Sequence, residues 1–314
     1  MIEIYKTNVE TGILEQTTQI QKGVWINIVN PSKEEIDILR REVNINPIFS
    51  TYLLDYEERA RVDVEDEQKL IVIDVPIVKD DKDHHHYLTT PLFMLNINDE
   101  IFITSAGQNL ELIDLFKQSK VKGFYTYKRT RFVLQILYYN AIQFLKYVKN
   151  ITKEIDSIEG KLQKHLENEE ILKMLSISKS LVYFSTSLKS NEVVMERLLK
   201  GRIMRLYEED EDILEDAIIE NKQAIEMTKI HTDILNSATE TYSSLISNNL
   251  NVVMKFLASV TIVLSLPTII ASLFGMNVIL PFASDDPMAF MYILLLSILI
   301  SGITFVWLKI KNLL

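Results

Sequence analysis

The sequence predicts an α+β membrane protein: an N-terminal cytoplasmic α/β domain, a helical hairpin, and a long stalk helix that continues into the first of two transmembrane helices. Strand-like segments are confined to residues 1–126, and no proline occurs between Pro91 and Pro267. Two uncharged segments, 256–284 and 287–308, close the chain. Since about 20 apolar residues cross a bilayer as a helix, each segment suffices for one span.

The N-terminal 126 residues predict a mixed α/β domain. Ser32 and Glu35 have capping-box spacing, so a short helix should follow Ser32. Asn98 and Asp99 form a plausible hairpin turn between the last two strands. The segments with strand length and composition are 24–29, 69–75, 92–97 and 100–105.

The proline-free region predicts almost continuous helix, because proline breaks helices. Gly160 and Gly201 are its expected interruptions, and no glycine lies between Gly201 and Gly275. We therefore expect helices near 127–158, 170–200 and from Glu208 to Phe274, which gives a hairpin at 127–207 and a stalk at 208–254. The last helix would be about 100 Å long and needs partners, as in a bundle or an oligomer.

The C-terminal quarter predicts two membrane spans with both chain termini in the cytoplasm. Lys255 precedes the first span, Lys309 and Lys311 follow the second, and only Asp285 and Asp286 lie in the connection. Lysines gather on the cytoplasmic side, and the N-terminus lacks an apolar segment that could serve as a signal peptide. The expected segments are 255–274 (first span), 275–287 (outer loop), 288–308 (second span) and 309–314 (tail), in the cell membrane.

Composition excludes several classes of function. A net charge of −10 argues against binding nucleic acid through charge, and the absence of cysteine excludes thiolate metal sites. The chain carries no Gly-rich phosphate loop, supported Ser-His-Asp arrangement or nucleotide-binding motif, so we do not expect an enzyme.

A polar stripe runs along one side of the first span. Its members fall within an arc of about 120° on a helical wheel, whereas Ser259 and Ala271 lie outside. The stripe consists of Asn251, Met254, Ala258, Thr261, Ser265, Thr268, Ser272 and Gly275. Small residues are also typical of tight packing between membrane helices, which is the alternative to a pore wall. Because no acid, lysine or histidine lies in either span, neutral oxygens would line such a pore, and they suit an ion such as Mg²⁺ that keeps its waters.

The tripeptide Gly275-Met276-Asn277, at the end of the first of two C-terminal spans, resembles the signature of the CorA family of magnesium and cobalt transporters. The two-span C-terminus, the α/β domain, the long helix and the segments around 25–35 and 56–66 resemble the family as well. The similarity covers essentially the whole chain.

The resemblance implies a funnel-shaped homopentamer in the lipid bilayer, with five first-span helices around one pore for divalent cations. Asn277 from five subunits would form a ring at the outer mouth that binds hydrated cation. Asn251 would form a polar ring near the inner surface, and Met254 with Leu257 a hydrophobic constriction.

An acidic segment at the start of the long helix, 208–216, has seven acids in nine residues. Such charge is favourable at a helix N-terminus, which is one explanation. The resemblance instead implies that Asp216, together with Asp212, binds regulatory Mg²⁺ between subunits and provides negative feedback. The acids proposed on the neighbouring subunit are Asp80 and Asp81.

The expected function is passive uptake of Mg²⁺, with Co²⁺ or Ni²⁺ as further ions, gated by cytosolic Mg²⁺. The alternatives are a relative that transports Zn²⁺ or works in efflux, and a membrane-anchored metal sensor that does not conduct. His84–His86 could suggest a Zn²⁺ or Ni²⁺ site, but an exposed loop is the preferred interpretation.

Overall fold

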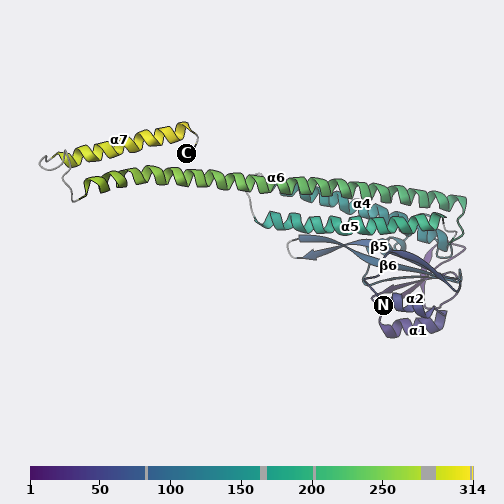
Figure 1. The fold of residues 1–314 in the computed structure, drawn as a ribbon. Helices are drawn as coiled ribbons and strands as arrows, with labels where there is room; N and C mark the ends of the chain where they lie inside the picture. The colour runs from purple at the N-terminus through teal and green to yellow at the C-terminus, as the bar shows by residue number, and fades with distance from the viewer. Residues whose placement is uncertain (82–83, 163–167, 201–202, 277–287, 312, 314) are drawn as a thin grey trace. The chain divides into compact units, whose positions relative to one another are not determined.

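The computed structural model describes the chain except residues 82–83, 163–167, 201–202, 277–287, 312 and 314 (Figure 1). The described residues form two compact units, Met1–Ser237 (unit 1) and Ala238–Leu314 (unit 2). Unit 1 contains β1 (Ile2–Thr7), β2 (Leu14–Thr17), β3 (Val24–Val29), α1 (Lys33–Val43), α2 (Pro47–Tyr52), β4 (Arg61–Glu65), β5 (Gln68–Asp81), β6 (His84–Ile97), β7 (Ile101–Ala106), α3 (Glu111–Lys117), α4 (Arg129–Leu162) and α5 (Asn168–Lys200). The long helix α6 (Glu208–Phe274) contributes to both units, and α7 (Ala289–Ile310) belongs to unit 2.

Unit 1 is built on a seven-stranded mixed sheet in the order β2-β1-β3-β7-β6-β5-β4. Within the described residues, β3 and β7 pair in parallel, and the other neighbouring strands of the sheet pair antiparallel. Helices α1 and α2 cover one face of the sheet, and α4 and α5 cover the other (Figure 1). Each face therefore buries its own hydrophobic core.

The side chains of β3 alternate between these two cores, as the two-residue period of a strand requires. Trp25 packs with α4, α5 and α6 residues, whereas Val24, Ile26 and Ile28 pack with α1 and α2. All four side chains are fully buried. The alternation explains why both faces of this strand are mainly apolar, with Asn27 as its one polar residue.

Two local predictions in unit 1 are confirmed. Ser32 caps α1: its hydroxyl accepts from the Glu35 amide, and the Glu35 carboxylate accepts from the Ser32 amide. Asn98 and Asp99 both have positive φ, of 51° and 52°, between β6 and β7. Two consecutive left-handed residues are what a type I′ hairpin turn needs.

Two other predictions are wrong. The strands β5 and β6 extend well beyond the expected ranges, and their register runs to Asp81 opposite His84. His84–His86 therefore lie in a strand rather than a loop, because cross-strand pairing overrides their polar composition. Likewise α4 continues through Gly160 to Leu162, since glycine costs an interior helix position only about 1 kcal/mol.

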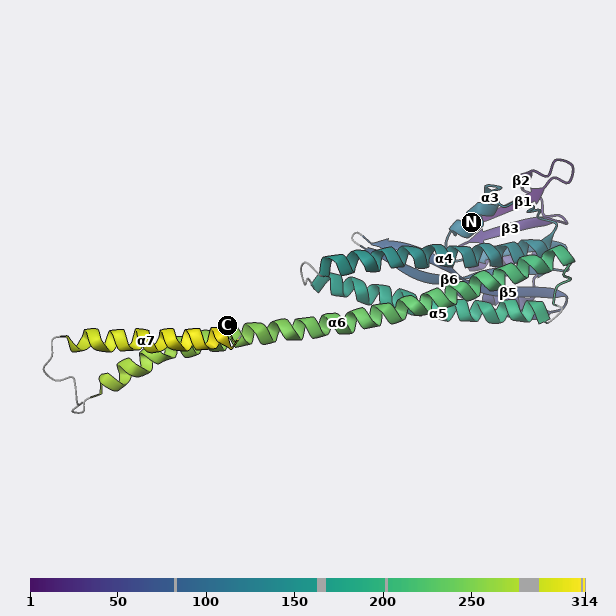
Figure 2. The ribbon, with the colours of Figure 1, turned by 90° about the horizontal axis from the view of Figure 1, so that it is seen from above.

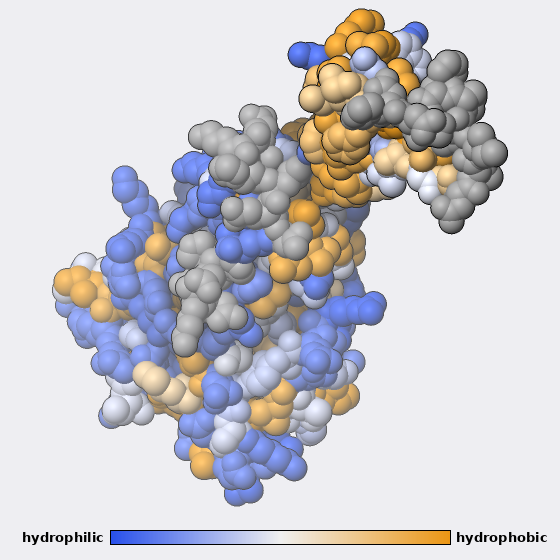
Figure 3. Space-filling model, turned by 90° about the vertical axis from the view of Figure 1, so that its left-hand side faces the viewer, coloured by the Kyte–Doolittle hydropathy of each residue, from blue (hydrophilic) through white to orange (hydrophobic). Residues whose placement is uncertain are grey.

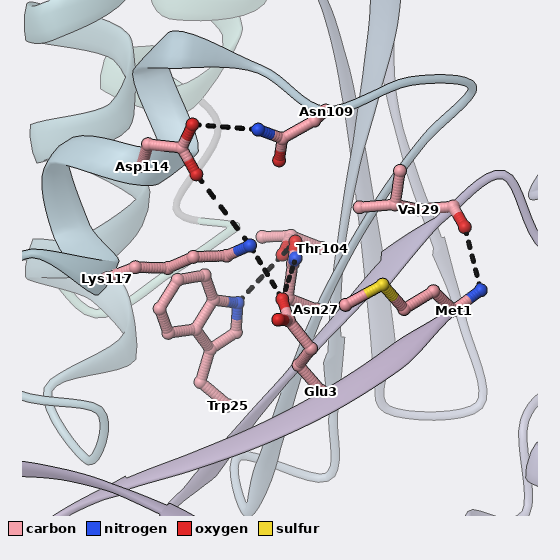
Figure 4. Close-up of polar contacts among 9 residues, drawn as sticks. All are labelled: Met1, Glu3, Trp25, Asn27, Val29, Thr104, Asn109, Asp114 and Lys117. Atoms are coloured by element: carbon pink, nitrogen blue, oxygen red, sulfur yellow. Dashed lines mark hydrogen bonds and ion pairs between the residues drawn. The ribbon is translucent and has the colours of Figure 1, made fainter.

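A chain of polar contacts fastens α3 to the sheet (Figure 4). The Lys117 ammonium lies 2.6 Å from Glu3, and the Asn27 amide donates to the same carboxylate oxygen. Thr104 donates to Asn27 and accepts from the Trp25 indole at 2.7 Å. Burial opposes ionisation of Glu3, yet the donors from Lys117 and Asn27 leave its pKa below the ordinary value. The contacts satisfy the polar groups that would otherwise be orphaned beneath α3.

In unit 2, α7 lies antiparallel beside the C-terminal part of α6 in both Figure 1 and Figure 2. Both helices are long and apolar enough to cross a membrane, and only 6% of each apolar window is buried. The colours in Figure 3 show this unit as mainly hydrophobic, whereas the visible surface of unit 1 is mainly hydrophilic. So much exposed apolar surface fits a lipid environment.

Candidate ion pathway and metal sites

The helix α6 runs without interruption from Glu208 to Phe274, as predicted, and includes Pro267. Its 67 residues correspond to about 100 Å. Proline lacks the amide hydrogen that would bond to the carbonyl four residues earlier, so the helix is locally weakened at this point. Because the helix nevertheless continues to Phe274, residues of one face stay in line along its part in unit 2.

One side of α6 packs against α7. Ser259 is 3% exposed, and its hydroxyl donates to the Leu313 carbonyl at 2.7 Å. The other covered positions follow helical spacing: Val260, Val263, Leu266, Pro267 and Ile270 are half-buried. The facing stripe on α7 consists of Ala289, Ile293, Ser297, Ile300, Ser301, Thr304 and Leu308.

The polar stripe lies on the opposite side of α6, about 180° around the helix from the covered residues. Ser265 is half-buried, and the other stripe residues of α6, with Gly275 beyond it, are exposed: Asn251, Met254, Ala258, Thr261, Thr268 and Ser272. Helix α7 thus packs on the face of α6 that contains Ser259, and packing against α7 does not explain the polar stripe. Leu257, at its edge, is 57% exposed.

The hydroxyls of the stripe bond to their own helix. Thr261 donates to the Leu257 carbonyl at 2.8 Å, Ser265 to Ile262 at 2.9 Å, and Thr268 to Leu264 at 3.3 Å. A hydroxyl has one hydrogen and two acceptor lone pairs. Because the hydrogen is directed to the helix backbone, the oxygens keep acceptor capacity for groups beside the helix.

The stripe ends at the tight C-terminus of α6. The Gly275 amide donates to the Ala271 carbonyl at 2.9 Å, and a Cβ at Gly275 would lie 3.2 Å from that same oxygen. This contact is tighter than an ordinary carbon–oxygen contact, which explains a glycine here. Met276 is 53% exposed, and Asn277 lies outside the described residues.

The acidic start of α6 is partly neutralised by a base from α4. Arg131 lies 2.6 Å from the Glu209 carboxylate and 2.9 Å from that of Asp210. Asp210 is 4% exposed, whereas the Glu209 side chain is 81% exposed. The hydrogen bond from Arg131 lowers the pKa of Glu209. Two of the seven acids therefore serve to attach α6 to α4.

Asp212 and Asp216 are exposed and lie one turn apart on α6. Burial raises the pKa of Tyr138 on α4, and the nearby negative charges of Glu220 and Asp216 raise it further. Asp216 therefore lies near Tyr138. No group of three or more metal-ligating side chains occurs in the parts of the chain that the structure describes. A divalent ion bound by these two carboxylates would need further ligands, from water or from another copy of the chain.

Asp80 and Asp81 lie at a different level along the helices. They pair with His85 and His84 near the end of the β5–β6 hairpin, and Tyr87 of this hairpin donates to Glu154 of α4 at 2.7 Å. Glu154 follows Tyr138 by 16 residues of α4, or about 24 Å. The structure therefore does not bring Asp80 and Asp81 together with Asp216 within one chain.

One polar contact between helices in unit 1 could not be found from sequence. His231 of α6 lies 2.9 Å from the Thr152 hydroxyl of α4, and Thr152 also donates to the Val148 carbonyl. Burial lowers the pKa of His231, against an opposing effect of Asp156. The residues are 79 positions apart and belong to no motif.

A family model for the CorA-like Mg²⁺ transporter protein matches residues 21–309, which is most of the chain. The chain belongs to the CorA family. This is a family of membrane ion transporters rather than enzymes, in agreement with two helices apolar enough to span a membrane.

Individual relatives support the same assignment. The cobalt/magnesium transport protein CorA of Methanocaldococcus jannaschii is 26% identical over 302 residues, which cover 93% of this chain and 92% of the relative. The complete structure of the CorA magnesium transporter from that organism has a TM-score of 0.82 at 23% identity, covering 98% and 97% of the two chains. The ZntB cytoplasmic domain from Vibrio parahaemolyticus has a TM-score of 0.61 at 12% identity, covering 78% of this chain and 98% of that one. These structural matches concern the fold.

Proposed function

We propose that this CorA-family protein is a homopentameric channel for passive uptake of Mg²⁺ across the cell membrane, with Co²⁺ or Ni²⁺ as further ions. The polar stripe of α6 lines the pore, and both chain termini lie in the cytoplasm. The observation that carries the proposal is the position of the stripe, which lies opposite the face packed against α7. A polar face left free by the chain's own helix pair is suited to meet its copies around a shared axis.

The chemistry of the stripe favours a hydrated cation. Waters bound to Mg²⁺ direct their hydrogens outward, and Mg²⁺ gives them up reluctantly. Thr261, Ser265 and Thr268 donate to helix carbonyls and so retain lone pairs for such waters. Asn251 at the inner end and Asn277 at the outer mouth would add amide oxygens, and Met254 with Leu257 would form the constriction.

We further propose that cytosolic Mg²⁺ closes the channel. Asp212 and Asp216 would hold the ion through carboxylate oxygens and waters, together with acids of a neighbouring subunit. Arg131 binds Glu209 and Asp210 instead, so neither of these two exposed carboxylates has a base within 4.0 Å among the described residues. Five acidic helix starts would repel one another when Mg²⁺ is lost, and the subunits would then separate.

Asp80 and Asp81 remain proposed ligands of this regulatory site only across a subunit interface. Along the α4 axis they lie about 24 Å from Asp216. If α4 ran parallel to the symmetry axis of the pentamer, rotation about this axis would not bring the two sites together. A tilted arrangement of subunits is required for these pairs to share an ion. Glu220, one turn beyond Asp216, provides a further carboxylate on the same helix.

Zn²⁺ transport or efflux is the second candidate, and similarity of fold to the ZntB domain favours it. Flux into proteoliposomes, measured side by side for Mg²⁺, Co²⁺ and Zn²⁺, distinguishes the two. We expect Mg²⁺ influx that Asn277→Ala abolishes, while the matched Asn249→Ala, an exposed position outside the stripe, leaves it unchanged. Zn²⁺ flux alone would reject the Mg²⁺ assignment, and no flux of any ion would favour a non-conducting sensor.

Protease protection tests the regulatory site. Mg²⁺ binding to the folded state should slow digestion of unit 1 in the wild-type protein, and less so in Asp216→Ala and Asp212→Ala. Asp233→Ala is the matched control, since Asp233 is also an exposed acid on α6. Equal protection of all variants would reject the regulatory site and leave the acids only their favourable interaction with the N-terminus of the helix.

A further inference from the structure

A cleft lined by four bases and four acids opens in unit 1 between the first turns of α4 and α6. Its volume is about 800 Å³, which is within the range that holds small-molecule ligands. We call it the α4–α6 cleft. Its lining residues are Asp99, Tyr127, Lys128, Arg129, Thr130, Arg131, Arg205, Tyr207, Glu208, Glu209 and Asp210.

Most acids of this cleft already have a cation or donor. Glu209 and Asp210 share Arg131, as described above. Asp99 lies 3.3 Å from the Lys69 ammonium and accepts from the Asn96 amide at 2.6 Å. Only Glu208 remains as a carboxylate without such a contact within the described part of the chain.

The bases show the opposite pattern. Lys128, Arg129 and Arg205 have no carboxylate within 4.0 Å among the residues that the structure describes; Lys128 and Arg205 instead lie over tyrosine rings. Three of the four bases in the cleft thus lack a close carboxylate, although Lys128 adds to the hydrogen bond from Arg131 in lowering the pKa of Glu209. A bound anion would gain attraction from these three cations, whose donors are not used by the acids of the cleft.

The first turn of α4 also favours binding of an anion. It contains Arg129 and Arg131 and no acid, whereas the first turn of α6 contains four acids. Bases are unfavourable at the positive end of a helix dipole, where unpaired backbone N–H groups can donate hydrogen bonds to an anion. The first turn of α4 lines the cleft together with Lys128 and Arg205.

Aromatic surface lies beside these cations. Tyr207 is 58% exposed, and the Arg205 guanidinium lies 5.2 Å from its ring centroid. Tyr127 is stacked on Tyr125 with 5.4 Å between centroids. An exposed ring next to an arginine offers a stacking surface to a planar base.

We propose that the α4–α6 cleft binds a nucleoside polyphosphate. Lys128 and Arg129 contact the phosphates, Arg205 contributes charge, and Tyr207 stacks on the base. The ligand would touch the turn that begins α6 without any requirement for ion conduction, so the proposal stands apart from the transport function.

Calorimetric titration of the full-length protein in detergent tests this proposal, with Mg²⁺-free ATP, inorganic tripolyphosphate and adenosine as probes. We expect ATP to bind, and Arg129→Gln/Arg205→Gln to weaken it by about 10-fold or more, as expected for lost charge-assisted hydrogen bonds. The matched control Arg40→Gln/Arg41→Gln removes two exposed arginines of α1, on the other face of the sheet, and should have no effect. Tyr207→Ala should weaken ATP but not tripolyphosphate.

Absence of ATP binding to the wild-type protein, or equal loss in the control double variant, would overturn the proposal. Equal binding of ATP and tripolyphosphate that Tyr207→Ala does not change would overturn its nucleoside part. Thermal melts check that the variants fold. Should the double variant melt early, the single change Arg205→Gln at an exposed side chain provides the same comparison.

Discussion

Replacement of Arg131 by methionine tests how α6 is attached to α4. Methionine keeps much of the side-chain length but leaves the Asp210 carboxylate, 4% exposed, without its cation. Loss of one partner from a buried ion pair costs about 3–5 kcal/mol, and a charge-assisted hydrogen bond contributes about 1.5–3 kcal/mol. Since the Arg131 side chain is 18% exposed, water can partly replace it. We expect the free energy of unfolding of unit 1 to fall by about 2–4 kcal/mol.

Urea unfolding followed by Trp25 fluorescence measures this loss, in a Trp307→Phe background that leaves one tryptophan. Trp25 is a suitable reporter because it shares a buried cluster with Leu214 of α6. Asp210→Asn added to Arg131→Met should recover part of the loss, because the unpaired charge is gone. The control is Lys146→Met on the same helix, whose pair with Glu111 is exposed and should contribute below about 1 kcal/mol. Equal effects of Arg131→Met and Lys146→Met would refute the buried attachment.

Three further predictions concern other positions. Ser259→Leu should destabilise the α6–α7 pair by about 1–3 kcal/mol in detergent melts, because a buried hydroxyl contact to Leu313 is replaced by bulk; a change as small as that of Ala271→Leu would contradict this. His231 has a lowered pKa from burial, so the unfolded state binds its proton more readily and stability should fall as pH drops below about 6.5. Urea midpoints at several pH values should show this slope reduced in His231→Gln, and an unchanged slope would count against it. Gly275→Ala should perturb the helix end, since its Cβ would crowd the Ala271 carbonyl, and unaltered protease accessibility of the outer loop would argue otherwise.

Features set by short-range chemistry could be predicted from the sequence. The Ser32–Glu35 capping box, the Asn98-Asp99 turn and the glycine-free helix from Glu208 to Phe274 each depend on residues close together in the chain. Helical periodicity also separated the polar stripe from Ser259. The same periodicity could not say that Ser259 meets Leu313, because this contact joins two helices.

Features that depend on tertiary pairing were missed or misjudged. The polar strand around His84–His86 looked like a loop because its partner strand supplies its stability. Arg131 reaches Glu209 and Asp210 across almost 80 residues, so the acidic segment looked uncompensated. The separation of Asp80 and Asp81 from Asp216 likewise follows from the arrangement of the hairpin on α4.

The central claim is that the polar stripe of α6 lines the path of the ion. Ala258 and Ala271 are both exposed on this helix, but only Ala258 belongs to the stripe. The decisive measurement is Mg²⁺ influx into proteoliposomes for Ala258→Leu and Ala271→Leu. We predict that Ala258→Leu reduces influx at least about tenfold by narrowing the pore, while Ala271→Leu keeps it within about twofold of wild type. Equal loss in both variants, or full influx in Ala258→Leu, would contradict the assignment of this face to the pore.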